Sequence, residues 1–403
     1  MKDLQRKGLL WGALVAVLVV QGTMLHELRQ RILNGEADFT AFYSAARVVA
    51  EGRGSQLYEF RTQSEFQRDF PARRTPLLFY HPPFELLLFL PLAGLSFAHA
   101  YAAWMGLNLA LLICMSYLRH PYDKMFPLFR GLLALLLALA FFPVSWSMVQ
   151  GQDSILLLLV FALAWMALRR SQSSRAGCIL ALGLFKFQFV LPFMAVLAVR
   201  KNWKALQGFL LTGLGLALVS LVPVGWQGLQ SYFGFLLEIN QRLAYGTIRP
   251  VSMPNLRGLV TSLSGTTLPA PWPVAIIALM SLLLLILAVW HWPQQSETID
   301  ERLDLPFALN LLVALLVSYH LNVHDLTVLF LFIALICRHV MATQAWTRWS
   351  GRTLCVCMIA LFLPPMVMPS QVLPPSPAPW LMLILLVALL AELRHTAQVV
   401  PAS

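Results

Sequence analysis

Charged side chains are scarce in this chain: Asp, Glu, Lys and Arg make up 12% of its 403 residues, against about 25% in soluble globular proteins. So few charges could not cover the surface of a water-soluble fold of this size. The 59% of hydrophobic residues excludes intrinsic disorder, and only five cysteines exclude a secreted disulfide scaffold. The composition therefore predicts a polytopic membrane protein surrounded by membrane lipids.

Acidic residues are fewer than basic ones, 18 against 29, which gives a formal net charge of +11. In a soluble protein this excess could indicate nucleic-acid binding. Beside apolar segments it is typical of cytoplasmic loops, so no nucleic-acid partner is expected. Cys355 and Cys357 have no second cysteine pair with which to hold a metal, so all five cysteines are interpreted as small apolar residues.

Residues 9–25 form the first apolar run, and the basic residues before it predict an uncleaved helix whose N-terminus lies inside the cell. The polar stretch 26–82 then lies outside, where helical spacing after Asp38 predicts short helices on the membrane surface. The later apolar runs are at about 83–95, 98–118, 131–149, 154–170, 176–199, 205–223, 272–292, 305–319, 325–337, 353–368 and 379–393.

Basic clusters between these runs should all lie inside, at Arg119/Lys124/Arg130, Arg169/Arg170/Arg175, Arg200/Lys201/Lys204, Arg338/Arg348/Arg352 and Arg394. All five clusters lie inside if residues 83–95 lie in the outer interface and residues 176–199 go out and return as two short helices broken near Lys186. One ordinary crossing of 176–199 is the alternative. The expected fold is an all-α, single-domain polytopic membrane protein over 1–403. It has about 12 crossings, both termini inside, and large outer loops at 26–97 and 224–271.

Polar residues at the boundaries of the apolar runs map to the outer face in this topology: Asp38, His81, Asp153, Lys186, Gln188, Asn255, Arg257, His320, His324 and Asp325. Ionisable groups at membrane depth are costly, which makes them candidates for function. The cations could neutralise a phosphate head group, and a carboxylate could act as general base.

Simpler structural roles stay open for several of these residues. Asp38 and Asp153 stand where helix N-caps belong, while His81 and Arg257 could be ordinary loop residues. The cluster at 320–325 contains His and Asp but lacks a separated third ligand set, so substrate hydrogen bonding is expected there rather than a metal.

Short motifs occur along the chain in a definite order: Asp38-Phe39 before a small-residue helix with Phe42, Tyr43, Gly52 and Tyr58, then Pro82-Pro83 and Pro91-Leu92, Gly151-Gln152, Lys186-x-Gln188, the loop NLRG at 255–258 and the turn YHLNVHDL at 319–326. Together they resemble the polyprenyl-phosphate-dependent mannosyltransferases of glycosyltransferase family 87 over roughly residues 8–340. The resemblance implies the C-type glycosyltransferase fold and an acidic catalytic residue in the first outer loop, a position that Asp38 matches.

The resemblance also implies a function. The enzyme would move a mannose-like hexose from a polyprenyl-phosphate donor to a lipid or glycan acceptor, with inversion, at the outer (periplasmic) face of the inner, plasma membrane. Asp38 would be the general base and the other nine residues would bind substrate, with no metal and no cofactor. A transporter or flippase of lipid-linked sugars is the alternative, although repeat symmetry would be typical of a transporter. A non-catalytic scaffold would not need the ionisable residues.

Overall fold

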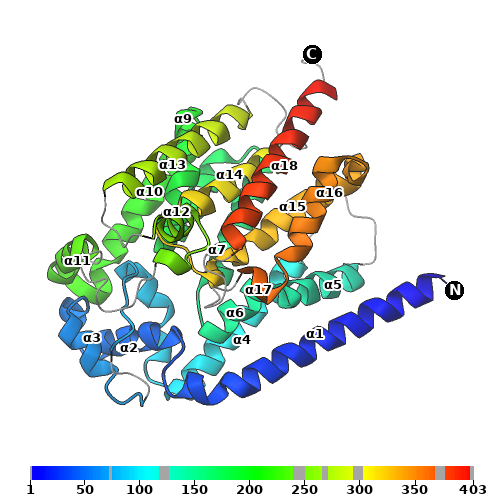
Figure 1. Cartoon of the computed structure of the whole chain (residues 1–403). Helices are drawn as coiled ribbons and strands as arrows, with labels where there is room; N and C mark the ends of the chain where they lie inside the picture. The colour runs from blue at the N-terminus through cyan, green and yellow to red at the C-terminus, as the bar shows by residue number, and fades with distance from the viewer. Residues whose placement is uncertain are drawn as a thin grey trace. The chain divides into compact units, whose positions relative to one another are not determined.

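The computed structural model describes residues 2–71, 75–117, 127–238, 250–265, 271–293, 303–367 and 377–399. Every regular element in these ranges is a helix, which confirms the all-α prediction (Figure 1). The chain divides into two compact units. Unit 1 contains residues 1–156 and 216–248, and unit 2 contains residues 157–215 and 249–403.

Unit 1 contains one long helix, several short helices and segments of 3₁₀ helix. Its elements are α1 (Lys2–Leu33), α2 (Phe39–Ala50), η1 (Gly54–Gln56), α3 (Phe60–Phe66), η2 (Pro83–Leu88), η3 (Leu90–Leu92), α4 (Phe97–Ser116), α5 (Pro127–Ala140), α6 (Phe142–Gln150) and α11 (Leu221–Glu238). The region 83–95, expected not to cross the membrane, forms only the short helices η2 and η3. At about 2 Å of rise per residue, neither could span a bilayer.

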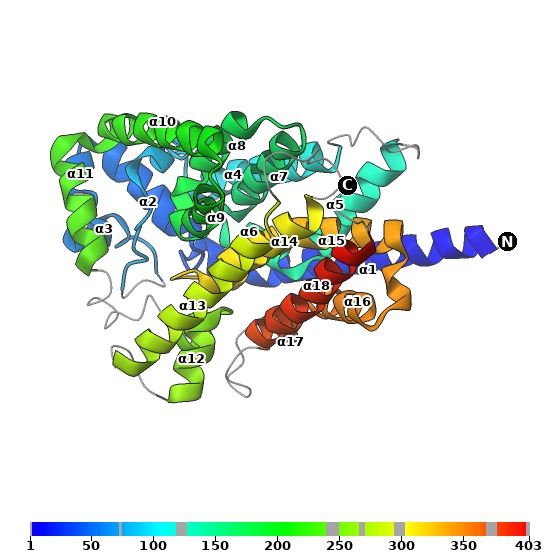
Figure 2. The ribbon, with the colours of Figure 1, turned by 90° about the horizontal axis from the view of Figure 1, so that it is seen from above.

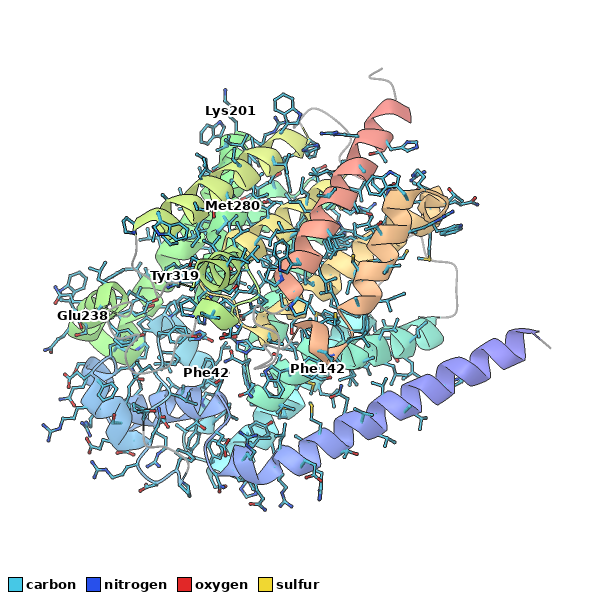
Figure 3. All side chains as sticks on the ribbon, in the orientation of Figure 1. Phe42, Phe142, Lys201, Glu238, Met280 and Tyr319 are labelled. Carbon is cyan, nitrogen blue, oxygen red and sulfur yellow. The ribbon has the colours of Figure 1, made fainter. Side chains whose placement is uncertain are left out.

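Aromatic side chains fill the core of unit 1. Phe39, Phe42, Phe89 and Trp104 are at most 2% exposed, and the rings of Phe42 and Phe89 stack with their centroids 4.7 Å apart. Such pairs add to the free energy of burying their area. Phe42 is labelled in Figure 3. Most residues of α2 are buried in this core. Protein side chains therefore cover the apolar face of α2, and its position on the membrane surface stays a prediction.

Unit 2 contains most of the remaining helices: α7 (Ser154–Arg169, from residue 157), α8 (Ser173–Leu182), η4 (Gly183–Lys186), α9 (Phe187–Val199), α10 (Trp203–Val219, to residue 215), η6 (Pro250–Ser252), α12 (Leu256–Ser264), α13 (Pro271–His291), α14 (Asp304–Val317), η7 (Val323–Val328), α15 (Leu329–Thr343), η8 (Ala345–Thr347), α16 (Trp349–Ala360), α17 (Pro364–Val367) and α18 (Ala378–Val399). Helix α14 is buried along almost its whole length. Figure 2 shows α13 and α14 running beside one another.

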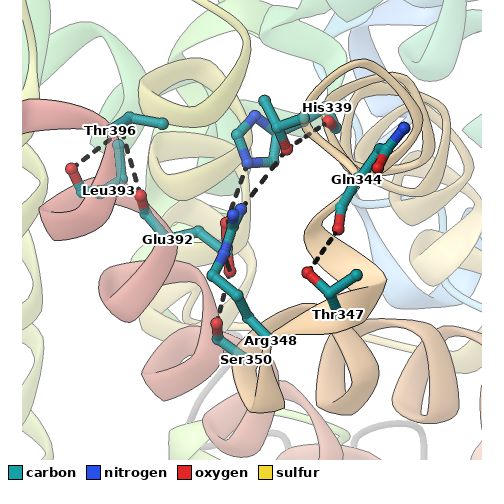
Figure 4. A network of polar contacts seen from close by, with 9 residues as sticks. His339, Gln344, Thr347, Arg348, Ser350, Glu392, Leu393 and Thr396 are labelled. Atoms are coloured by element: carbon teal, nitrogen blue, oxygen red, sulfur yellow. Dashed lines mark hydrogen bonds and ion pairs between the residues drawn. The ribbon is translucent and has the colours of Figure 1, made fainter. Parts of the chain in front are cut away.

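A buried carboxylate holds three helical segments of unit 2 together (Figure 4). Glu392 of α18 is fully buried. It accepts hydrogen bonds from Arg348 at 2.5 and 3.1 Å and from the Ser350 hydroxyl, and it lies 3.1 Å from His339 of α15. These contacts compensate the charge of Glu392 and link α15, α16 and α18.

Several helices are long and apolar enough to cross a membrane. Five qualify alone: Phe97–Ser116, Ser173–Val199, Pro271–His291, Val323–Thr343 and Ala378–Thr396. Up to seven qualify if two bent pairs, Gly131–Ala140 with Phe142–Gln150 and Trp203–Val219 with Leu221–Glu238, each count as one span. Exposed leucines on α13, including Leu279 and Leu283, present the apolar surface that lipid would contact. These helices identify a membrane protein, while the expected 12 crossings exceed the spans found in the described ranges.

The interpretation of 176–199 as two short helices that go out and return is wrong. Residues Ser173–Val199 satisfy the criteria for a single span of 27 residues, which is about 40 Å at 1.5 Å per residue. The helix tightens to the 3₁₀ segment η4 at Lys186 and continues. Two of the basic residues used to infer that reversal, Arg119 and Lys124, lie outside the described residues.

Candidate active site

Asp38 stands directly before α2, the place of an N-cap, yet its side chain does not cap the helix. Its carboxylate accepts a hydrogen bond from the side-chain amide of Gln152 at 2.9 Å. Its backbone N–H donates to the side-chain oxygen of Gln150 at 3.1 Å. The side chain is half-buried. The N-cap alternative is therefore not supported, and the carboxylate is instead oriented by a neighbouring turn.

That turn begins where α6 ends at Gly151. Gly151 has φ +63°, the left-handed conformation that glycine adopts at helix ends. A Cβ at this position would lie 2.6 Å from the Cβ of Phe39, so the close approach also requires glycine. The Trp104 indole donates to the Gly151 carbonyl at 2.9 Å, and the Tyr101 hydroxyl donates to the Val149 carbonyl at 2.9 Å. These bonds satisfy helix-end carbonyls and fix the two glutamines that hold Asp38.

His81 ends an extended segment whose backbone is held by side chains. Gln67 binds Leu77 in both directions at 2.8 Å. Gln63 binds Phe79, accepting from its N–H at 2.7 Å and donating to its carbonyl at 3.2 Å. The Tyr58 hydroxyl donates to the His81 carbonyl at 2.7 Å, and burial raises the pKa of this phenol well above its usual value, so it remains a donor.

The imidazole of His81 meets two carboxylates, forming what we call the acid–histidine cluster (His81, Glu85 and Asp153). The His81 Nδ1 lies 2.7 Å from a Glu85 oxygen and 3.5 Å from Oδ2 of Asp153. All three side chains are buried, with exposed fractions of 7%, 1% and 0%. His81 and Glu85 come from HPPFE, and Asp153 follows Gln152 directly. Three groups of this kind can share protons or bind a cation.

In unit 2, Lys186 forms a buried ion pair with Asp325. The Lys186 Nζ lies 2.5 Å from Oδ1 of Asp325, and the exposed fractions of the two residues are 3% and 1%. Lys186 is the last residue of η4, and Asp325 lies in the first turn of η7. The ammonium group thus has a carboxylate partner within the protein.

The turn around Asp325 gathers the other late polar residues. The second carboxylate oxygen accepts from the backbone N–H of Asn322 at 2.8 Å, and His324 Nε2 lies 3.6 Å from the first. The Asn322 amide lies 3.1 Å from His320 Nε2. Burial lowers the pKa of His320 to about 4, so this imidazole is neutral near pH 7.

Asn255 and Arg257 border this turn. Asn255 caps α12: its side-chain oxygen accepts from the Gly258 N–H at 3.0 Å and its amide donates to the Ser318 carbonyl at 2.7 Å. Arg257 donates to the Tyr319 carbonyl at 3.0 Å and stacks over the Tyr319 ring at 4.0 Å. Burial lowers the pKa of Arg257 from its usual high value, and the guanidinium remains charged. Tyr319 lies beside α12 (Figure 3).

The structure thus gathers the ten predicted residues into two sets. Asp38, His81 and Asp153 belong to unit 1, and the seven others to unit 2. Gln188 lies in the first turn of α9 and is half-buried. The sequence prediction missed Glu85, although its i,i+4 spacing from His81 was a usable signal. It also omitted Gln150 and Gln152 as site residues, and no sequence signal assigns them to Asp38.

Comparison with known proteins gives one family. The family model of Glycosyltransferase family 87 matches residues 79–318, more than half of the chain. The matched region contains the acid–histidine cluster, Lys186 and Arg257. Searches of curated proteins and of solved structures give no match. The match confirms the resemblance found in the sequence and favours an enzyme over a transporter: this chain belongs to glycosyltransferase family 87.

Proposed function

We propose that this glycosyltransferase moves a mannose-like hexose from a polyprenyl-phosphate donor to a lipid or glycan acceptor, with inversion, at the outer face of the plasma membrane. The observation that carries the proposal is the set of contacts made by the Asp38 side chain. Its carboxylate precedes α2 without capping it and is hydrogen-bonded by Gln152. A carboxylate held in this way is suited to taking a proton from a substrate hydroxyl.

In the proposed reaction, Asp38 removes the proton from an acceptor hydroxyl. The resulting oxygen attacks the anomeric carbon of the donor sugar. The bond from that carbon to the phosphate oxygen breaks, and the lipid phosphate leaves with the electron pair. The amide of Gln152 occupies one face of the carboxylate, at 2.9 Å from Oδ2, and so orients the group for proton transfer.

A leaving phosphate requires positive charge, and two of the buried cations of unit 2, Lys186 and Arg257, differ in the contacts that they make. Lys186 is paired with Asp325. Arg257 donates to one backbone carbonyl and stacks on one ring, and its guanidinium has five N–H donors in all. We therefore assign Arg257 as the main phosphate ligand and Lys186 as a supporting charge. Asn255 positions Arg257 by capping α12, and Gln188, His320 and His324 bind the remaining polar groups of the substrate.

The test is product formation by purified protein with a panel of polyprenyl-phosphate sugars. Asp38→Asn keeps the shape of the side chain but cannot accept the proton, so turnover should fall by at least about 100-fold. Donor binding and thermal stability should be nearly unchanged. Asp69→Asn is the matched control, because Asp69 is an exposed acid of the same chain segment; its turnover should equal that of the wild type.

Two outcomes would contradict the proposal. Equal turnover by wild type and Asp38→Asn would remove Asp38 from the catalytic role. A wild-type protein that binds polyprenyl-phosphate sugars and transfers none of them to any acceptor would refute the proposed donor.

A further inference from the structure

The proposed proton transfer at Asp38 does not use the three side chains of the acid–histidine cluster. The cluster combines one imidazole nitrogen and two carboxylates, each offering one ligand atom, and these atoms all lie within 4.8 Å of one another. All three residues are buried. We propose that His81, Glu85 and Asp153 bind one divalent transition-metal ion, of the Zn²⁺ or Mn²⁺ class.

The first argument is the donor set. The cluster lies among aromatic rings: Phe42 and Phe79 have their centroids 5.0 and 5.6 Å from that of His81. Two carboxylates beside one imidazole are a donor set that attracts a divalent cation, because carboxylate oxygens and imidazole nitrogens are both ligands of first-row metal ions.

The second argument is geometry. The His81 Nδ1 lies 2.7 Å from a Glu85 oxygen and 3.5 Å from Asp153 Oδ2, and a single N–H can point at only one of the two carboxylates. A metal ion can contact all three groups. Ligand atoms about 2.1 Å from an ion are about 3.0–3.4 Å apart. The Asp153 distance is close to this range, and the Glu85 oxygen reaches it by moving a few tenths of an ångström.

The third argument is preorganisation. The backbone of His81 is fixed by Tyr58, and His81 and Glu85 are brought together across the first turn of η2. Fixing the backbone of a ligand residue reduces the conformational freedom that is lost when an ion binds. The imidazole ligand distinguishes the preferred ion, since Mg²⁺ and Ca²⁺ favour sites made entirely of oxygen.

The position of the site suggests its role. Asp153 follows Gln152, whose amide holds Asp38. A metal ion bound here would link the turn at 151–153 to the segment 81–85. Because Gln152 stands next to the ligand Asp153, the ion would also help to position Asp38. The role proposed for the ion is to position this turn, and its three ligands are buried. Binding of the ion does not depend on the proposed glycosyl transfer.

The experiment measures the metal directly. Purified wild-type protein, analysed by inductively coupled plasma mass spectrometry, should contain about one divalent transition-metal ion per chain. After the ion is removed with a chelator, titration with Mn²⁺ followed by electron paramagnetic resonance, and with Zn²⁺ in competition, should give one site with a Kd below about 10 µM. Removal of the ion should also lower the melting temperature.

Substitutions then locate the site. Glu85→Gln and Asp153→Asn preserve size while removing a ligand charge, and each should weaken binding by at least about 100-fold. Glu392→Gln is the matched control, because it also changes a fully buried carboxylate beside a histidine. It should retain the ion, as should Asp38→Asn.

The wild-type measurement is decisive even if a ligand variant fails to fold. A wild-type protein with no bound transition metal and no saturable Mn²⁺ or Zn²⁺ binding would overturn the inference. If such a metal-free protein still transferred sugar, the proposed function would stand while the metal site failed. If the wild type and Asp38→Asn both bound the metal and showed equal turnover, the metal site would stand while the proposed function failed.

Discussion

The buried ion pair of Lys186 and Asp325 gives a quantitative prediction about stability. Both side chains are almost fully buried, and Nζ and Oδ1 are 2.5 Å apart. Lys186→Met would leave the carboxylate without its cation. Removing one member of a buried pair typically costs about 3–5 kcal/mol, whereas replacing both charges is often nearly neutral.

The double variant Lys186→Met with Asp325→Asn removes both charges. The amide introduced by Asp325→Asn would still offer an oxygen to the backbone N–H of Asn322, which the carboxylate now binds at 2.8 Å. We therefore expect Lys186→Met alone to lower the melting temperature by on the order of 10 °C, since about 1 kcal/mol corresponds to a few degrees. The double variant should recover most of this loss.

The assay is thermal unfolding of the two single variants and the double variant in detergent, followed by intrinsic fluorescence, with the donor affinity of each measured in parallel. A double variant destabilised by the sum of the two single losses would show that the residues act independently, which refutes the reasoning. An unchanged melting temperature for Lys186→Met, together with weaker donor binding, would instead make Lys186 primarily a phosphate ligand.

Three further predictions concern single positions. Arg257→Gln should weaken donor binding by about 10- to 150-fold in a binding assay, the value of one charge-assisted hydrogen bond, while Arg170→Gln at an exposed site of the same unit should not. Gly151→Ala should destabilise the protein by about 1–2 kcal/mol or more in thermal unfolding, because of the positive φ and the contact with Phe39, whereas Gly106→Ala meets no atom within 4 Å and should be tolerated. Burial lowers the pKa of His320 to about 4, so between about pH 4 and 6.5 the unfolded chain binds a proton that the folded chain does not. The free energy of unfolding should therefore rise with pH across this window and fall as the pH drops towards 4. His320→Gln should flatten the profile of melting temperature against pH there.

The sequence predicted most of the membrane helices because hydropathy alone defines them. The apolar runs at 98–118 and 272–292 correspond closely to α4 and α13. It failed at Lys186, where a charge inside an apolar run was taken as a reversal of the chain. The helix continues there because Asp325, 139 residues further on, neutralises the charge, and no local pattern reveals a partner at that distance.

The same limit applies to the candidate site. Polar residues between apolar runs pointed to Asp38, His81 and Asp153 because unusual positions are visible in one chain. The partner of Asp38 was not visible, because Gln152 reaches Asp38 across 114 residues. Glu85 was missed although it stands four residues after His81. Only the fold shows that Asp153 and Glu85 meet at the same imidazole.

The extended segment 77–81 is aligned by a helix instead of by another strand. Gln63 of α3 and Gln67 at its C-terminal end are four residues apart, about 6 Å along the helix axis, and their partners Phe79 and Leu77 are two residues apart, about 6.6 Å along an extended chain. The spacing of the two glutamines on the helix therefore matches the spacing of alternate residues in the segment. A shift of the segment by one residue relative to the glutamines would turn His81 to the opposite side of the segment. The spacing of two glutamines thus sets which way His81 points. A single-residue insertion between Phe79 and His81 would turn the histidine away from Asp153 without altering any residue of the cluster, while the spacing of His81 and Glu85 would stay the same.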